Sequence, residues 1–243
     1  MVFRDLSKIG YLAGINDDST ASSINVKGVD GFTLESKIKV DPTKGLYWQF
    51  LTYPDLKWDD YLQFINEPKH LVNPIRDVRL FDNIVLELFT MTPWWFIPIG
   101  WMPVIIYFFN QSELTWQLNL VFGALGFLFW TFMEYTLHRF LFHAEDYWLP
   151  KHRFFMAHHF LIHGIHHAFP MDRYRLVFPV VPGYAIIGGF IITPLKHLLP
   201  VEYQGATIAG ALLMYIFYDM IHYMMHHSSP QDSYFKDLKK YHM

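Results

Sequence analysis

Long apolar stretches alternate with polar, histidine-rich segments along the last two thirds of the chain. Four stretches approach the length of about 20 apolar residues that a membrane-spanning helix needs, and they cover residues 93–109, 116–137, 176–199 and 205–221. The second would measure roughly 33 Å as an α-helix. The third contains three prolines, so we expect it to be kinked or broken. The pattern predicts an all-α integral membrane protein with about four transmembrane helices.

The first third of the chain has a different pattern. Residues 1–45 are polar and irregular, whereas residues 46–65 carry spaced aromatic and apolar side chains that Pro54 divides into two short helices. Because Trp and Tyr favour the membrane–water interface, we expect this second segment on the lipid headgroups or against the core that carries the site. We therefore predict a cytosolic linker and interfacial segment over residues 1–79 and a membrane domain over residues 80–243.

Basic residues are distributed unevenly among the segments that join the apolar stretches. The turn between the first and second apolar stretches has no Lys or Arg, and the turn between the third and fourth has only Lys196. The other Lys and Arg residues lie before residue 80, between His138 and Arg175, or after residue 235. The positive-inside rule then places both termini and residues 138–175 in the cytosol.

Composition supports the membrane assignment and excludes several kinds of site. The chain is 52% hydrophobic and 19% aromatic, with a net charge of −3, so nothing indicates a nucleic-acid partner. It has no cysteine, which excludes disulfides, thiolate zinc sites, iron–sulfur clusters and thiolate-ligated haem. The first ten residues contain no long apolar run, so we expect no cleaved signal peptide.

Histidines form three spaced clusters in the segments expected to be cytosolic. The clusters read H-x-x-x-x-H (His138, His143), H-x-x-H-H (His163, His166, His167) and H-x-x-x-H-H (His222, His226, His227). Helix positions i, i+3 and i+4 share one face, so the imidazoles of the second and third clusters are expected to converge. Neutral imidazole is the commonest nitrogen ligand of zinc, copper, iron and nickel. Core histidines or a pH-sensitive surface would not explain three clusters with ligand spacing.

Charge and spacing agree on where the clusters meet. The second and fourth apolar stretches both end on the cytosolic side, at His138 and His222, and residues 151–167 are expected to form a cytosolic helix between Pro150 and Pro170. All three clusters should therefore gather at one membrane face, in a histidine-rich cap.

Two carboxylates lie close to these histidines in the sequence. Glu134 precedes His138 by one turn, and Asp219 precedes His222 by three residues. A metal-bound imidazole usually donates its other N–H to a carboxylate or a carbonyl, so we interpret both acids as partners of the ligands. A snorkelling or ion-paired acid is the alternative. Tyr218 is a weaker candidate for lining the same cavity.

The residues narrow the possible chemistry. H-E-x-x-H is absent, which disfavours a zinc protease. Haem or zinc-transport ligands would lie within the spans. The eight histidines of these clusters are too many for one four-coordinate zinc, and the Glu-x-x-His pattern of di-iron carboxylate bundles is missing. The remaining possibility is a pair of iron ions with histidine ligands. Such a pair would activate dioxygen for reaction with an aliphatic chain.

Four stretches resemble one known family. They are EYTLHRFLFH (134–143), HFLIHGIHH (159–167), PMDRYRLVFP (170–179) and DLKKYHM (237–243). Together they resemble the fatty acid hydroxylase superfamily, which includes sterol desaturases and C4-methyl sterol oxidases, and within it most closely the fatty acid 2-hydroxylases. The resemblance covers roughly residues 80–243, and more loosely the chain from residue 41.

The resemblance implies a multi-pass enzyme of the endoplasmic reticulum membrane. It would hydroxylate C2 of a fatty acyl chain, within ceramide, with dioxygen and with electrons from cytochrome b5. Two metal ions would be bound, and iron would be the working metal. We expect zinc in purified protein, since a nitrogen site generally binds zinc more tightly than ferrous iron. The implied metal ligands are His138, His143, His163, His166, His167, His222, His226, His227 and His242.

The chain departs from the family pattern at both ends. The family's last H-x-x-H-H box is represented only by His242, and no His-Pro-Gly-Gly cytochrome b5 motif occurs, so we expect a fragment of a longer protein. Two other functions stay open. One is a sterol oxidase or desaturase with the same metal cage, and the other is a metal-binding membrane protein without enzymatic activity.

Overall fold

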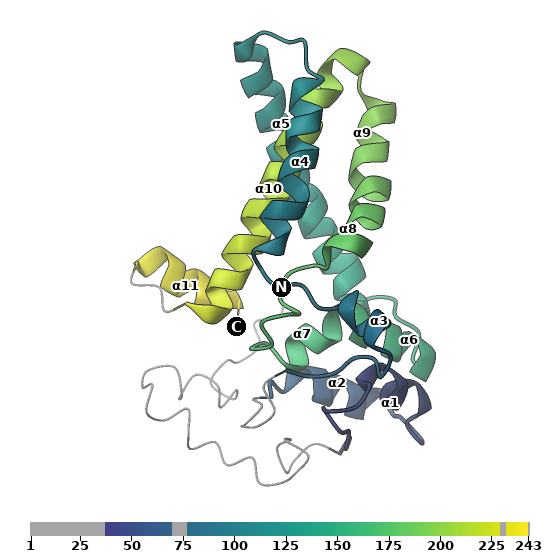
Figure 1. Cartoon of the computed structure of the whole chain (residues 1–243). Helices are drawn as coiled ribbons and strands as arrows, with labels where there is room; N and C mark the ends of the chain where they lie inside the picture. Colours follow the sequence, from purple (N-terminus) through teal and green to yellow (C-terminus); the bar gives the residue numbers. More distant parts are fainter. Residues whose placement is uncertain (1–36, 70–76, 229–231, 243) are drawn as a thin grey trace. The chain divides into compact units, whose positions relative to one another are not determined.

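The computed structural model describes residues 37–69, 77–228 and 232–242, and every regular element in these ranges is helical (Figure 1). This confirms the all-α prediction for the described residues. The chain divides into two compact units. The first unit comprises residues 1–82 and 149–172, and the second comprises residues 83–148 and 173–243.

The first unit packs two short N-terminal helices against a histidine-bearing helix. Its elements are α1 (Leu46–Thr52), α2 (Trp58–Asn66), α6 (Arg153–His159), a π-helical turn (Phe160–Gly164) and α7 (Ile165–Ala168). Their core is aromatic: the ring centroids of Phe50 and Phe160 are 4.2 Å apart, and Phe50, Tyr61 and Phe64 are fully buried. Of the two places expected for residues 46–65, the structure supports packing against a core.

The second unit contains the helices of the four apolar stretches. They are α4 (Phe96–Asn110), α5 (Trp116–Leu137), α8 (Val180–Ile187), α9 (Thr193–Leu198) and α10 (Val201–His227). The remaining elements are α3 (Ile84–Leu88), a π-helical turn (His138–Phe142), a 3-10 turn (Ala144–Asp146), a second π-helical turn (Gly188–Ile192) and α11 (Ser233–His242). Each of the four apolar stretches in the sequence is thus helical.

Prolines distort the third stretch without ending it. Pro194 has no N–H to donate and crowds the preceding turn. The chain widens into the π-helical turn just before it, where the Thr193 backbone N–H donates to the carbonyl of Gly188. Helices α8 and α9 therefore continue each other through this turn.

Small residues bring α5 and α10 unusually close. A Cβ atom added to Gly126 would lie 1.9 Å from the Thr207 carbonyl oxygen, and one added to Gly210 would lie 2.0 Å from the Gly123 carbonyl oxygen. In membranes, helices associate through such small-residue contacts because burial of apolar surface gives no driving force there. The glycines therefore fix how the two helices that carry His138 and His222 meet.

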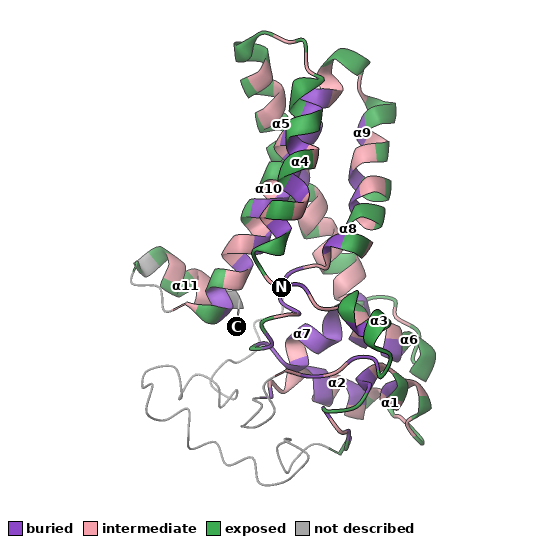
Figure 2. Cartoon of the chain, viewed as in Figure 1, coloured by how far each residue is buried: buried purple, intermediate pink, exposed green. Residues whose placement is uncertain are grey.

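Within the described ranges, two helices are long and apolar enough to cross a membrane. One runs over residues 116–142 and the other over residues 201–227, each with 27 residues. Only 11% of the most apolar window of the first is buried, and most of α5 is exposed or half-buried in Figure 2. A core helix of a soluble protein would be covered, so this exposed apolar surface indicates a membrane protein. The total of about four transmembrane helices stays a prediction.

Candidate metal centre

His138 stands at the end of α5 with both a carboxylate and a phenol at one ring nitrogen. Its Nδ1 lies 3.1 Å from Glu134 Oε1 and 3.1 Å from the Tyr218 hydroxyl on α10. A carboxylate only accepts hydrogen bonds, so this contact favours the tautomer in which Nδ1 carries the proton. Nε2 is then the nitrogen with a lone pair for a metal. Glu134 and Tyr218 thus both contact His138, and a role as partners of a metal ligand stays a prediction.

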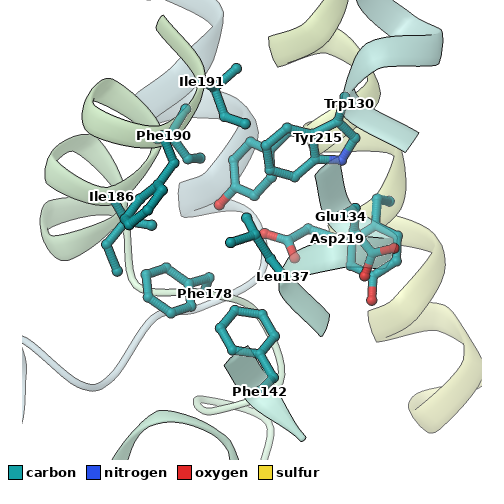
Figure 3. A pocket seen from close by; sticks show the side chains of 12 residues that line it. Trp130, Glu134, Leu137, Phe142, Phe178, Ile186, Phe190, Ile191, Tyr215 and Asp219 are labelled. Carbon is teal, nitrogen blue, oxygen red and sulfur yellow. The ribbon is translucent and has the colours of Figure 1, made fainter. Parts of the chain in front are cut away.

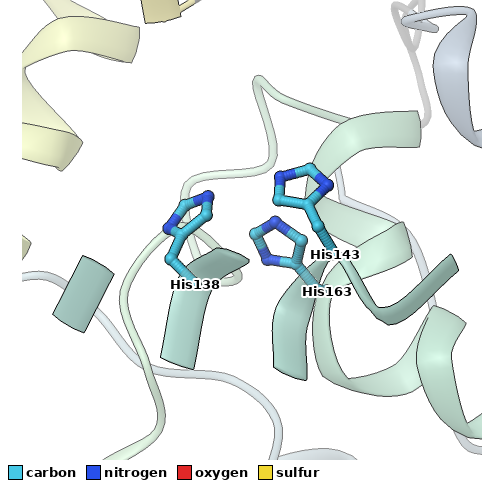
Figure 4. Close-up of side chains that lie close together, drawn as sticks. All are labelled: His138, His143 and His163. Atoms are coloured by element: carbon cyan, nitrogen blue, oxygen red, sulfur yellow. The ribbon is translucent and has the colours of Figure 1, made fainter. Parts of the chain in front are cut away.

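The π-helical turn explains how His143 comes next to His138. Five residues along an α-helix correspond to a rotation of about 140° away from the starting face. In a π turn, residue i+5 hydrogen-bonds to residue i, and here the His143 N–H donates to the His138 carbonyl at 3.0 Å. The two imidazole centroids are consequently 5.1 Å apart (Figure 4).

A second carboxylate, which the sequence analysis missed, holds His143. Glu145 Oε1 lies 3.0 Å from His143 Nδ1, and the glutamate side chain is only 4% exposed. The arrangement repeats that of Glu134 and His138. The signal in the sequence was an acid two residues after a predicted ligand, a spacing that helical periodicity does not favour.

The second cluster lies on the π-helical turn and α7 of the first unit. His163 and His166 are buried and His167 is half-buried. The Nε2 atoms of His163 and His167 are 2.9 Å apart. Tetrahedral zinc with bonds of about 2.0–2.1 Å would hold two nitrogens roughly 3.3 Å apart, so a small rotation of these rings would suit a shared metal ion.

The third cluster lies in the last turns of α10. His222 and His226 are buried, with ring centroids 5.0 Å apart, and Tyr218 stacks on His222 at 6.0 Å. His227 instead packs against Tyr223, with centroids 4.6 Å apart, and is exposed. His222 and His226 thus converge as the i, i+4 spacing predicts.

An apolar cavity of about 60 Å³ lies beside Glu134 in the second unit (Figure 3). Its polar lining consists of Glu134, Tyr215, Tyr218 and Asp219, and the other lining residues are Trp130, Leu137, Phe142, Phe178, Ile186, Ile187, Phe190 and Ile191. Such walls favour an aliphatic group, and the few polar atoms can orient one end of it. Tyr215 and Trp130 were not expected from the sequence.

Asp219 lines this cavity and is buried. Its carboxylate interacts with the Tyr215 hydroxyl, one turn earlier, and with the backbone N–H of Phe178. A buried acid in an apolar wall is costly unless it is paired in this way. The role of Asp219 as a partner of His222 stays a prediction.

The predicted ligands are distributed over both units. The first unit holds His163, His166 and His167, and the second holds His138, His143, His222, His226 and His227. His242 belongs to α11, but its side chain lies outside the described part of the chain.

Comparison with known proteins identifies relatives over most of the chain. The ceramide very long chain fatty acid hydroxylase scs7 of Schizosaccharomyces pombe is 38% identical over 84% of this chain. The dihydroceramide fatty acyl 2-hydroxylase FAH2 of Arabidopsis thaliana is 39% identical over 76% of this chain. The chain spans 58% of the length of the first relative and 76% of the second. No protein-family model matches the chain.

One solved structure is similar in fold and sequence. It is that of full-length scs7p, in which only the hydroxylase domain is visible, with a TM-score of 0.77 and 37% identity. The match covers 86% of this chain and 76% of that one.

Proposed function

The chain belongs to the family of fatty acid 2-hydroxylases, and from that membership we propose that it hydroxylates C2 of a fatty acyl chain in ceramide or dihydroceramide. The observation that carries the proposal is the paired arrangement of carboxylate and imidazole at His138 and His143. Both Nδ1 atoms are held by glutamates, as in metal-ligating histidines. The relatives named for acyl hydroxylation give the reaction class.

We propose two metal ions, held by the nine histidines predicted from the sequence. The donor set suits them, because neutral imidazole binds iron and zinc alike. Iron would supply the activation of dioxygen, which zinc cannot because it has no redox chemistry.

The protein's own residues would orient the ligands and the substrate. Glu134 and Glu145 accept hydrogen bonds from the Nδ1–H groups of His138 and His143, so that each Nε2 would be the nitrogen that binds a metal ion. The apolar cavity beside Glu134 would bind the acyl carbons near the ligands and keep water from them. Tyr218 and Asp219, at the polar side of this cavity, would set the position of C2 relative to the ligands.

The surroundings of the enzyme are part of the proposal. It would lie in the endoplasmic reticulum membrane, with the site and both termini in the cytosol and with cytochrome b5 as electron donor. We propose residues 80–243 as the hydroxylase membrane domain and residues 1–79 as a linker and interfacial segment.

The test is turnover by the purified chain after anaerobic loading with ferrous iron. Ceramide and a C4-methyl sterol are supplied separately with cytochrome b5, its reductase and NADPH, and the products are identified by mass spectrometry. We expect a 2-hydroxyacyl product from ceramide only. Product from the sterol alone would replace the proposed substrate, and bound metal without any oxygen-dependent product would mean a binding protein.

Two histidine variants make the test specific. His163→Ala and His226→Ala should abolish turnover while the protein stays in the membrane. His197→Ala is the matched control, because this histidine is exposed and lies outside the clusters. Near-normal metal content and turnover in either cluster variant would contradict the ligand assignment.

A further inference from the structure

Helix α3 has its polarity reversed relative to a helix on a water-exposed surface. Ile84, Val85 and Leu88 are 57–63% exposed, whereas Glu87, the one charged residue of the helix, is 4% exposed. Exposed apolar patches of this kind mark an interaction surface. The patch continues along the chain through Phe89, Trp94, Trp95 and Phe96, each 41–48% exposed.

The second unit holds α3 firmly in this orientation. The Arg175 guanidinium donates to the buried carboxylate of Glu87, and the Thr92 N–H donates to the Tyr174 carbonyl at 2.8 Å. Asn83 caps the helix, since its side chain accepts hydrogen bonds from Val85 N and Leu86 N. Burying an ion pair costs desolvation free energy, which is offset only when the pair has good geometry and further hydrogen bonds. The fold therefore orients α3 with its charge inward and its apolar side chains outward.

A second exposed group lies where α5 ends. Arg139 donates to the hydroxyls of Tyr135 and Tyr147, and the Trp148 indole donates to the Phe140 carbonyl at 2.5 Å. These four aromatic side chains are 45–56% exposed. Tyr and Trp with a snorkelling Arg are typical of the headgroup region of a bilayer.

Contacts with α10 relate the two groups. Trp94 of the first group packs against Tyr223, with centroids 6.1 Å apart. His138, the chain neighbour of Arg139 in the second group, contacts Tyr218. Tyr218 and Tyr223 are separated by a rise of only about 7.5 Å along the helix. We refer to the two exposed groups together as one band.

We propose that this band is the bilayer interface and that α3 lies in the headgroup region of a phospholipid membrane. The helix that follows the patch in the chain favours lipid over a protein partner, because Ile99, Ile106 and Phe109 of α4 are also 52–60% exposed. Helix α3 is then a membrane anchor that does not span the bilayer. It fixes the height of His138 and His222 at the membrane surface, whatever reaction they serve.

The chain contains no cysteine, so single spin labels can test the proposal on the full chain. Leu88→Cys and Val85→Cys place a label on α3, and Leu128→Cys places one on the exposed side of α5. Gln111→Cys is the control, at the opposite end of α4 from Trp95. Each labelled protein is reconstituted into phosphatidylcholine vesicles, and collisions with oxygen and with a water-soluble nickel chelate are measured.

Labels at positions 85 and 88 should collide with oxygen several-fold more, relative to nickel, than the label at 111, and less than the label at 128. Equal nickel access at 88 and 111 would place α3 in water and overturn the proposal. Dipolar broadening between labels at 88 would assign the patch to a second copy of the chain. Positions 85 and 88 lie on the same face of α3. If one labelled variant fails to insert into vesicles, the other still tests the proposal.

Discussion

At the scale of single residues, carboxylates hydrogen-bond to two of the predicted ligand histidines and orient them. Glu134 and Glu145 each contact an Nδ1 atom, yet one stands one turn before its histidine and the other two residues after it. The first follows from helical periodicity. The second depends on the π-helical and 3-10 turns that follow α5, whose geometry the apolar pattern does not encode.

We expect Glu145→Gln to weaken metal binding by about 10- to 100-fold, as loss of such an oriented hydrogen bond does. The amide keeps the shape of the side chain but lowers the basicity of the imidazole that it contacts. Competition with a chelator measures the affinity. The control is Glu113→Gln, which alters an exposed acid in the turn between α4 and α5 and should leave the metal affinity unchanged. Equal metal affinities in the two variants would contradict a ligand role for His143.

Lys69 is a buried lysine of the first unit whose charge is costly. Its Nζ donates to the carbonyls of Phe64 and Glu67, at 2.5 and 2.7 Å. Burial nevertheless lowers the pKa of Lys69 from its ordinary 10.5 to about 7, although the negative charge of Glu67 acts to raise it. Between these two values the unfolded chain binds more protons than the folded chain, so stability contributed through Lys69 rises with pH.

The free energy of unfolding of the wild type relative to Lys69→Met should therefore increase from pH 7 toward pH 10 and stay constant below pH 7. Denaturant unfolding across this range measures the difference. Lys39→Met, at an exposed lysine of the same unit, is the control. A difference that fell with rising pH would mean that the two carbonyl contacts hold the ammonium charged in the folded state.

At the scale of elements, the apolar pattern located the long helices well. Helix α5 matches its predicted stretch, and α10 extends the fourth stretch at both ends. Helix α3 was not foreseen, because five residues, four of them apolar and one acidic, are too few to show a period from which to infer a helix. The Tyr61 hydroxyl, 2.5 Å from His159 Nδ1, joins α2 to α6 across 98 residues of sequence, and no local pattern predicts such a contact.

Close packing of α5 on α10 makes a further prediction. Gly210→Ala would place a methyl group against the Gly123 backbone, and overpacking of this kind costs about 1–3 kcal/mol. We expect a lower midpoint of thermal unfolding in detergent. Gly189→Ala is the matched control, since a Cβ atom there meets no atom within 4 Å beyond its own stretch of helix backbone. An equal loss in both variants would point to backbone effects instead of packing.

At the scale of the whole molecule, the metal content decides between chemistries. We expect two metal ions per chain, with zinc predominant in recombinant protein because nitrogen sites favour it over ferrous iron. Elemental analysis before and after anaerobic ferrous reconstitution measures both. Full turnover by a zinc-loaded protein free of iron would defeat the oxygenase mechanism, and a single metal ion would mean that several clustered histidines are not ligands.

The π-helical turn after α5 also links metal occupancy to backbone shape. His138 and His143 come together only in the wider turn, whose closing hydrogen bond runs from the His143 N–H to the His138 carbonyl. Any ion held by both imidazoles favours that turn over an ordinary α-helical one by its difference in affinity for the two. The turn in return makes the ion bind more tightly, since linkage is reciprocal. The spacing H-x-x-x-x-H therefore couples the stability of the π-helical turn to the binding of an ion by the two histidines. Each is less stable without the other.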